Sequence, residues 1–341
     1  MQSATISGSL PEAWFLSITP YPGSSRTSPT IETVPPTLAN PEPLNRKAPP
    51  PGANSDSSAS ARQLQAPSLL RLWHLASLDA PTVAVVWALA FAWAAKVRLP
   101  LWIPVLLALV AWAVYVGDRL LDAQAALGAS QPHRLRERHR FHWRHRSILI
   151  PMAIAAACIA ACIVFLLMPA GARERNSLLA TAAFAYLTRV HSCRKASLFL
   201  FPQLSKELLV GLLFTAACAL PALSRAAAPP GSSLWILIGP ALFFAALAWL
   251  NCHAIERWES RGPSSCNLQV LPAACLLTPA GLLFAVILAP AHLRLAALVA
   301  TGAASALLLA LLDRCRHRLT PIALRAAADI TLLTPLILLL Q

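Results

Sequence analysis

Two predicted helices each carry a pair of acidic side chains with a spacing that suits metal ligands. In the first pair, Asp118 and Asp122 are four residues apart and follow the apolar stretch from Leu99 to Val116. On a helix the two carboxylates lie on one face and repel each other, and at the edge of a membrane such charges are costly. A bound cation would remove that cost. The pair therefore predicts Mg²⁺ binding, because Mg²⁺ prefers carboxylate oxygens and needs only one or two beside substrate phosphates.

The second pair, Glu256 and Glu259, ends another apolar run and lies on one helical face for the same reason. The sequences Asp-Arg-x-x-Asp at 118–122 and Glu-Arg-x-x-Ser at 256–260 resemble two copies of one motif. The chain has only 14 acidic residues, and weak internal symmetry is common in membrane bundles. We therefore predict a second metal site here. The simpler alternative is a solvated helix end without a metal for the first pair, and a polar interfacial loop for the second.

The composition predicts an integral membrane protein. Of 341 residues, 57% are hydrophobic and 12% charged, and the mean hydropathy is +0.59, whereas soluble domains carry about 25% charged residues. Apolar runs fall at 80–96, 99–121, 147–168, 177–190, 205–223, 234–254, 268–289, 292–312 and 323–340. No run shows the alternation of a strand, so we predict an all-α, polytopic bundle of about nine transmembrane helices.

The first 66 residues differ from the rest of the chain. They hold eleven of the 29 prolines, many Ser and Thr, and no apolar run long enough to span a membrane. We predict a disordered Pro/Ser-rich tail at 1–66 and a nine-helix membrane domain at 67–341.

The net charge of +14 is carried by short loops between apolar runs, which indicates membrane topology and anionic lipid rather than nucleic acid. If the run at 99–121 ends in the cytoplasm, loops on that side carry 14 Lys and Arg against 6 outside. This predicts that both acidic pairs face the cytoplasm, in the cell inner (plasma) membrane. The segment 133–146 holds six Arg and four His and is expected to contact anionic lipid, or to clamp diphosphate as a lid.

At these motifs the chain resembles the UbiA superfamily of intramembrane prenyltransferases, which have nine helices and Asp-rich motifs ending the second and sixth. The resemblance covers about 75–340. Residues 118–122, Asp-Arg-Leu-Leu-Asp, match half of the first motif, and 254–257, Ala-Ile-Glu-Arg, resemble the start of the second. Residues 77–81 resemble the segment that opens the family's first helix, and Lys206-Glu207 with Gly211 resembles the beginning of its fifth.

The resemblance implies an enzyme, a transferase of alkyl groups other than methyl, that moves a prenyl group from a prenyl diphosphate to a lipophilic acceptor. It also implies roles for particular residues. Asp118 and Asp122 would be catalytic and hold one Mg²⁺, and Glu256 and Glu259 would hold a second. Three basic residues would steady the diphosphate: Arg119, Lys206 and Arg257.

Departures from the family pattern favour an alternative function. Val114 and Tyr115 stand where the first motif usually has Asn-Asp, Glu256 replaces an Asp, and Ser260 stands where the final Asp is expected. The alternative is a non-catalytic or transport-like membrane protein that retains the bundle. A haem or quinone electron carrier ranks last, because only His253 and His191 approach the paired histidines that it needs.

Overall fold

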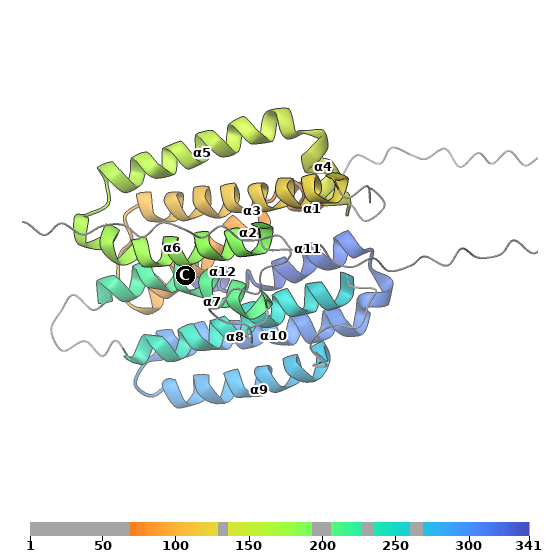
Figure 1. The fold of residues 1–341 in the computed structure, drawn as a ribbon. Helices are drawn as coiled ribbons and strands as arrows, with labels where there is room; N and C mark the ends of the chain where they lie inside the picture. The colour runs from red at the N-terminus through yellow and green to blue at the C-terminus, as the bar shows by residue number, and fades with distance from the viewer. Residues whose placement is uncertain (1–68, 129–135, 193–205, 227–234, 260–268, 341) are drawn as a thin grey trace, which may run out of the picture. The chain divides into compact units, whose positions relative to one another are not determined.

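The computed structural model describes residues 69–128, 136–192, 206–226, 235–259 and 269–340, and the regular structure in these ranges is helical (Figure 1). The α-helices are α1 (Leu69–Leu75), α2 (Asp79–Ala94), α3 (Trp102–Gly128), α4 (Glu137–Arg144), α5 (Arg146–Leu166), α6 (Ala170–Ser192), α7 (Lys206–Ala226), α8 (Trp235–Glu259), α9 (Val270–Leu288), α10 (Leu293–Cys315), α11 (Pro321–Thr331) and α12 (Leu336–Leu339), with a 3₁₀ turn, η2 (Arg316–Arg318), after α10. The prediction of a disordered tail concerns residues outside these ranges.

Six helices of the described chain are long and apolar enough to cross a membrane: α3, α5, α7, α8, α9 and α10. A seventh span is possible if α1 and α2, which meet at a bend of 90°, count as one. The prediction of an all-helical, multi-pass membrane protein is confirmed at this level. The count of nine spans is not confirmed. The first turns of α6 carry the charged residues Arg173, Glu174 and Arg175, and a break after Thr331 leaves α11 and α12 too short to span a membrane.

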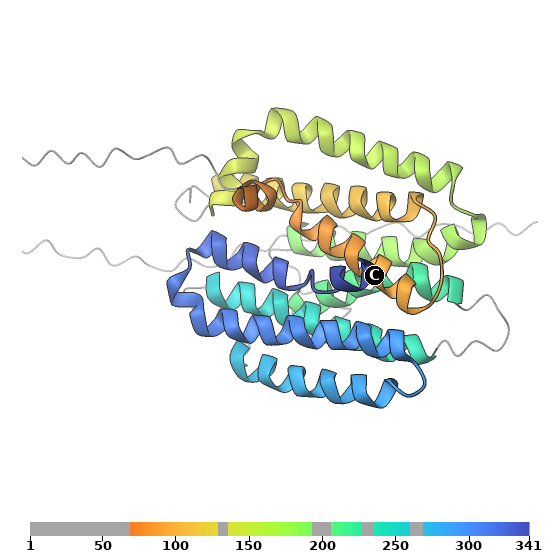
Figure 2. The ribbon, with the colours of Figure 1, turned by 180° about the vertical axis from the view of Figure 1, so that it is seen from behind.

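The core of the bundle is built from aromatic and small side chains of α2, α7, α8 and α10. Trp87 of α2 stacks on Phe244 of α8 with ring centroids 3.8 Å apart, and both side chains are fully buried. The indole Nε1 of Trp87 also donates a 2.8 Å hydrogen bond to the Leu332 carbonyl. This bond ties α2 to the C-terminal helices, which lie beside it in Figure 2.

Helices α7 and α8 approach each other closely at Gly211. A Cβ on Gly211 would lie 2.8 Å from the Trp249 backbone nitrogen, which cannot move without shifting α8. Gly211→Ala is therefore expected to lower stability by about 1–3 kcal/mol, the usual cost of overpacking. Thermal unfolding in detergent measures the effect.

Gly117→Ala is the matched control, because a Cβ there meets nothing within 4 Å. It should be neutral or stabilise α3 by up to about 1 kcal/mol through helix propensity. Equal melting temperatures for Gly211→Ala and the unchanged protein would contradict the close packing.

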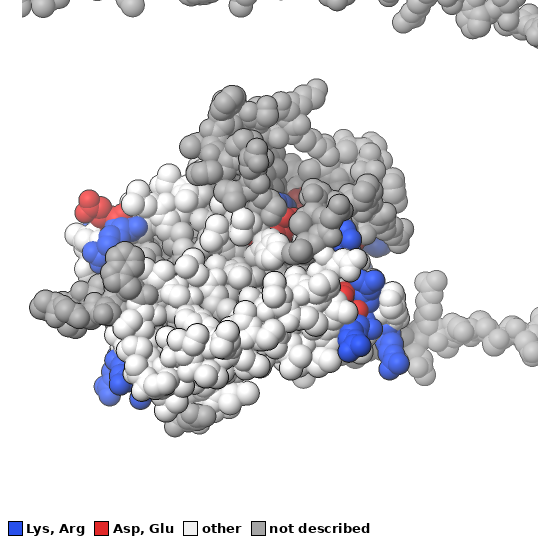
Figure 3. Space-filling view, turned by 90° about the horizontal axis from the view of Figure 1, so that it is seen from below, with Lys and Arg blue, Asp and Glu red and all other residues white. Residues whose placement is uncertain are grey.

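On the face in Figure 3, charged side chains gather mostly toward the two ends of the bundle, with a smaller acidic and basic group between them. Helices α3, α8 and α10 end at the same side of the bundle as α1, α4 and the beginning of α11 (Figure 1). We call this side the α4 end. Both acidic pairs lie there, as the distribution of Lys and Arg predicts for one side of a membrane.

Candidate functional site

The first acidic pair lies in the second half of α3, next to the short basic helix α4. Asp118 is half-buried, and the Asp122 side chain is 41% exposed. The Asp122 carboxylate lies 3.8 Å from Nε2 of His139, on α4. The two carboxylates present the oxygen donors that Mg²⁺ prefers.

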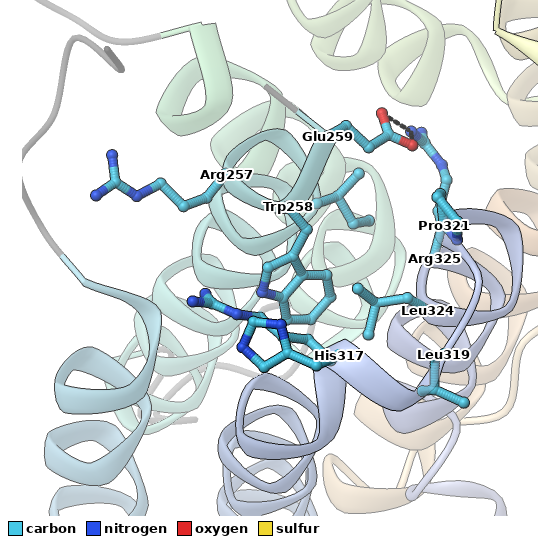
Figure 4. Close-up of a pocket in the computed structure, with 10 residues that line it drawn as sticks. Arg257, Trp258, Glu259, His317, Leu319, Pro321, Leu324 and Arg325 are labelled. Carbon is cyan, nitrogen blue, oxygen red and sulfur yellow. Dashed lines mark hydrogen bonds and ion pairs between the residues drawn. The ribbon is translucent and has the colours of Figure 1, made fainter. Parts of the chain in front are cut away.

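The second acidic pair is arranged differently. Glu259 is held by three arginines: Arg136, Arg138 at 3.5 Å, and Arg325, whose Nη1 donates to both carboxylate oxygens at 3.1 and 3.2 Å. Figure 4 shows Glu259 directed toward Arg325, with Arg257 extending in the opposite direction. Glu256 is exposed. Because guanidinium groups surround the Glu259 carboxylate, Glu256 and Glu259 do not fit a second Mg²⁺.

Helix α4 joins the two acidic pairs. His139 contacts Asp122 of α3, and the neighbouring Arg138 contacts Glu259 of α8. The ends of α3 and α8 therefore lie on two sides of one basic helix. Three guanidinium groups around one carboxylate leave an excess of two positive charges here, which suits a phosphate group.

A pocket of about 410 Å³ opens beside Glu259, between the end of α8, η2 and α11 (Figure 4). Its basic lining is Arg257, Arg316, His317 and Arg325, and its apolar lining includes Trp258 and Leu324. Asp313 fixes one wall, because it accepts hydrogen bonds from Trp258 Nε1 at 2.7 Å and Arg316 Nη1 at 3.2 Å. The pocket thus combines cationic groups with an apolar wall.

A buried hydrogen-bond network anchors α4 to the bend between α1 and α2. The Ser77 hydroxyl, at a backbone φ of 60°, lies 2.9 Å from Nε2 of His142 and accepts a 2.5 Å hydrogen bond from Arg119 Nη1. Nδ1 of His142 lies 2.9 Å from the Arg138 carbonyl. A neutral His142 completes both hydrogen bonds, because its Nδ1 donates to the Arg138 carbonyl and its Nε2 accepts from the Ser77 hydroxyl.

The two buried histidines of α4 predict that acid destabilises the protein. Burial lowers the pKa of His139 to about 4, and Arg136 and Arg119 act in the same direction. Burial, followed by Arg119, lowers the pKa of His142 to about 4. Because the unfolded chain binds these protons near pH 6.5, stability is expected to fall as the pH drops from about 6.5 toward 4.

Thermal unfolding at pH 7.5 and pH 5 measures this loss. His142→Gln cannot titrate and should show a smaller drop in melting temperature, whereas His317→Gln, in the exposed turn η2, should behave like the unchanged protein. An unchanged drop in a variant that lacks both His139 and His142 would refute the assignment.

Two of the remaining predicted site residues lie on helices other than α3, and the third, Arg119, is buried. Lys206 is exposed at the beginning of α7, and Arg257 belongs to the pocket at α8. Arg119 is 2% exposed, and its guanidinium donates to Ser77, Asp79 and the His74 carbonyl rather than facing an open site. Sequence reasoning missed Asp329 as a site residue. An acidic residue inside the apolar run 323–340 was a signal that could have revealed it.

This fold and site define a multi-pass α-helical membrane protein with a basic, partly buried polar cluster at one end. Comparison with family models, with curated proteins and with solved structures found no match in any of the three.

Proposed function

We propose that this protein is a membrane-embedded transferase of the UbiA type, which moves a prenyl group from a prenyl diphosphate to a lipophilic acceptor. The proposal rests above all on α4, which contacts Asp122 through His139 and Glu259 through Arg138. An acidic pair suited to Mg²⁺ thereby lies near a group of arginines suited to diphosphate.

In this proposal the site holds one metal rather than two. Asp118 and Asp122 would hold Mg²⁺, which when bound stabilises the charge that develops on a departing diphosphate. Glu259 has a positioning role, because its carboxylate holds Arg136, Arg138 and Arg325 together. These arginines would bind the phosphate oxygens, since a planar guanidinium can contact two of them at once.

The apolar part of the substrate would lie in the bundle or against its lipid-facing surface. Exclusion of water would keep the prenyl group from being lost to hydrolysis while it is transferred to the acceptor. The described part of the basic segment, 136–146, lies at the same α4 end and would contact anionic lipid headgroups of the inner (plasma) membrane.

Turnover in a lipid environment tests the proposal. Purified protein in nanodiscs that contain a bacterial lipid extract would be incubated with labelled geranyl, farnesyl or geranylgeranyl diphosphate. We expect Mg²⁺-dependent transfer of label into the lipid fraction with release of diphosphate, and none after chelation. If none of the three donors is bound, the proposal fails.

The ion pairs of Glu259 favour one second candidate, a non-catalytic or transport-like protein that binds the diphosphate without transferring its prenyl group. The three arginines block the second metal site that the resemblance implies. This candidate would be favoured over the transferase if the protein bound a prenyl diphosphate tightly but transferred no label to any lipid extract tested.

A further inference from the structure

A second cluster of potential metal ligands lies inside the bundle, apart from Asp118 and Asp122. His74 of α1, Asp79 of α2 and Asp329 of α11 place one ligand atom each within 4.8 Å of the others. His74 Nδ1 lies 2.7 Å from Asp79 Oδ2 and 3.8 Å from Asp329 Oδ2. Ligand atoms around an ion with bonds of 2.0–2.1 Å are roughly 3.0–3.4 Å apart, so small side-chain adjustments would suffice.

Residues in and next to this cluster carry buried side-chain atoms that lack a hydrogen bond. Oδ1 of Asn251 lacks a hydrogen-bond partner, and Nδ1 of His74 makes no well-aligned hydrogen bond, although it lies 2.7 Å from Asp79 Oδ2. His74 is 1% exposed and Asn251 5%. Asn251 reaches Asp329 through its amide nitrogen at 3.3 Å, which leaves its carbonyl oxygen available nearby. Buried polar atoms are normally paired, so such a group indicates an ion or water that completes the site.

Two arginines lie near the two carboxylates of this cluster. Arg119 pairs with Asp79 at 3.4 Å, and the Arg325 guanidinium is engaged by Glu259. Asp329 accepts a hydrogen bond from the Asn251 amide at 3.3 Å, and His74 Nδ1 lies 2.7 Å from Asp79 and 3.8 Å from Asp329. A buried negative charge requires compensation.

We propose that His74, Asp79 and Asp329 bind a first-row divalent metal ion, with the Asn251 carbonyl oxygen as a further ligand. The imidazole nitrogen selects Zn²⁺, Co²⁺ or a neighbouring metal over Mg²⁺, which prefers an all-oxygen shell. The ion would link α1, α2, α8 and α11 beneath α4. It is distinct from the Mg²⁺ of the proposed transferase and does not depend on that function.

Metal binding tests this proposal without any assay of activity. Full-length protein, purified without a polyhistidine tag and treated with a chelator, would be titrated with Zn²⁺ alone and with Co²⁺ alone. We expect about one tightly bound Zn²⁺ per chain, a rise in melting temperature on binding, and visible absorption bands from the Co²⁺ form.

The variants His74→Gln and Asp329→Asn should each weaken Zn²⁺ binding by more than the 10–100-fold typical of losing an outer-shell partner. His317→Gln makes the same substitution in an exposed turn and should bind Zn²⁺ normally. Even if a variant fails to fold, the Co²⁺ spectrum of the unchanged protein distinguishes this site from a cysteine site. Histidine and carboxylate ligands give no thiolate charge-transfer band, whereas cysteine ligands do.

Two results would overturn the proposal. Absence of tight Zn²⁺ and Co²⁺ binding by the unchanged protein would mean that the cluster is held by its own His74–Asp79 contact and takes up no metal ion. Equal binding by the unchanged protein and His74→Gln would place the metal elsewhere, for example on cysteine side chains.

Discussion

Arg119→Met is expected to lower stability by about 3–5 kcal/mol, the cost of breaking a buried ion pair from one side. The guanidinium of Arg119 is the partner that Asp79 and Ser77 share, and all three residues are at most 2% exposed. Methionine fills a similar volume but leaves the Asp79 charge with one partner fewer in the interior. A loss of this size is a large part of the stability of a typical protein, so little folded protein should be recovered.

Size-exclusion profiles and thermal unfolding in detergent measure this effect. Arg294→Met is the matched control, because Arg294 is exposed and contacts only the Trp93 ring and carbonyl among the described partners. It should cost less than about 1 kcal/mol. Equal stability of Arg119→Met and Arg294→Met would show that the network around Ser77 is not needed for folding.

Asp118→Asn and Asp122→Asn should each weaken Mg²⁺-dependent binding of farnesyl diphosphate at least about 100-fold while leaving the fold intact. Asparagine keeps the shape of aspartate and one oxygen but removes the negative charge that Mg²⁺ requires. It also removes repulsion between two carboxylates one turn apart, so the melting temperature without ligand should stay the same or rise slightly.

Equilibrium binding with labelled farnesyl diphosphate measures this loss. Glu174→Gln, which changes an exposed carboxylate near the beginning of α6, controls for the change in net charge and should bind normally. If Asp118→Asn binds as tightly as the unchanged protein, the pair is only a solvated helix end.

The sequence predicts the helical class and the location of the acidic pairs because both follow from local patterns. Long apolar runs identify membrane helices, and the distribution of Lys and Arg places the ends of α3 and α8 on one side. Spacing also places Asp118 and Asp122 on one face of α3. These inferences need no knowledge of which helices are neighbours.

The partners of Glu259 could not be predicted in this way. Arg138 and Arg325 lie 121 and 66 residues away in the sequence, and only the packing of α4 and α11 against α8 brings them to Glu259. The same holds for His74 and Asp329, which meet because α1 and α11 are in contact. Spacing gives the residues of one helix that share a face, whereas contacts between helices require the fold.

Titration of the unchanged protein with labelled farnesyl diphosphate, with and without Mg²⁺, tests the proposed site most directly. The protein would be in nanodiscs, with inorganic diphosphate as competitor. We expect saturable binding that strengthens at least about tenfold with Mg²⁺ and that inorganic diphosphate competes away. Absence of binding, or binding that neither Mg²⁺ nor inorganic diphosphate alters, would contradict a diphosphate site at Asp118, Asp122 and the arginines around α4.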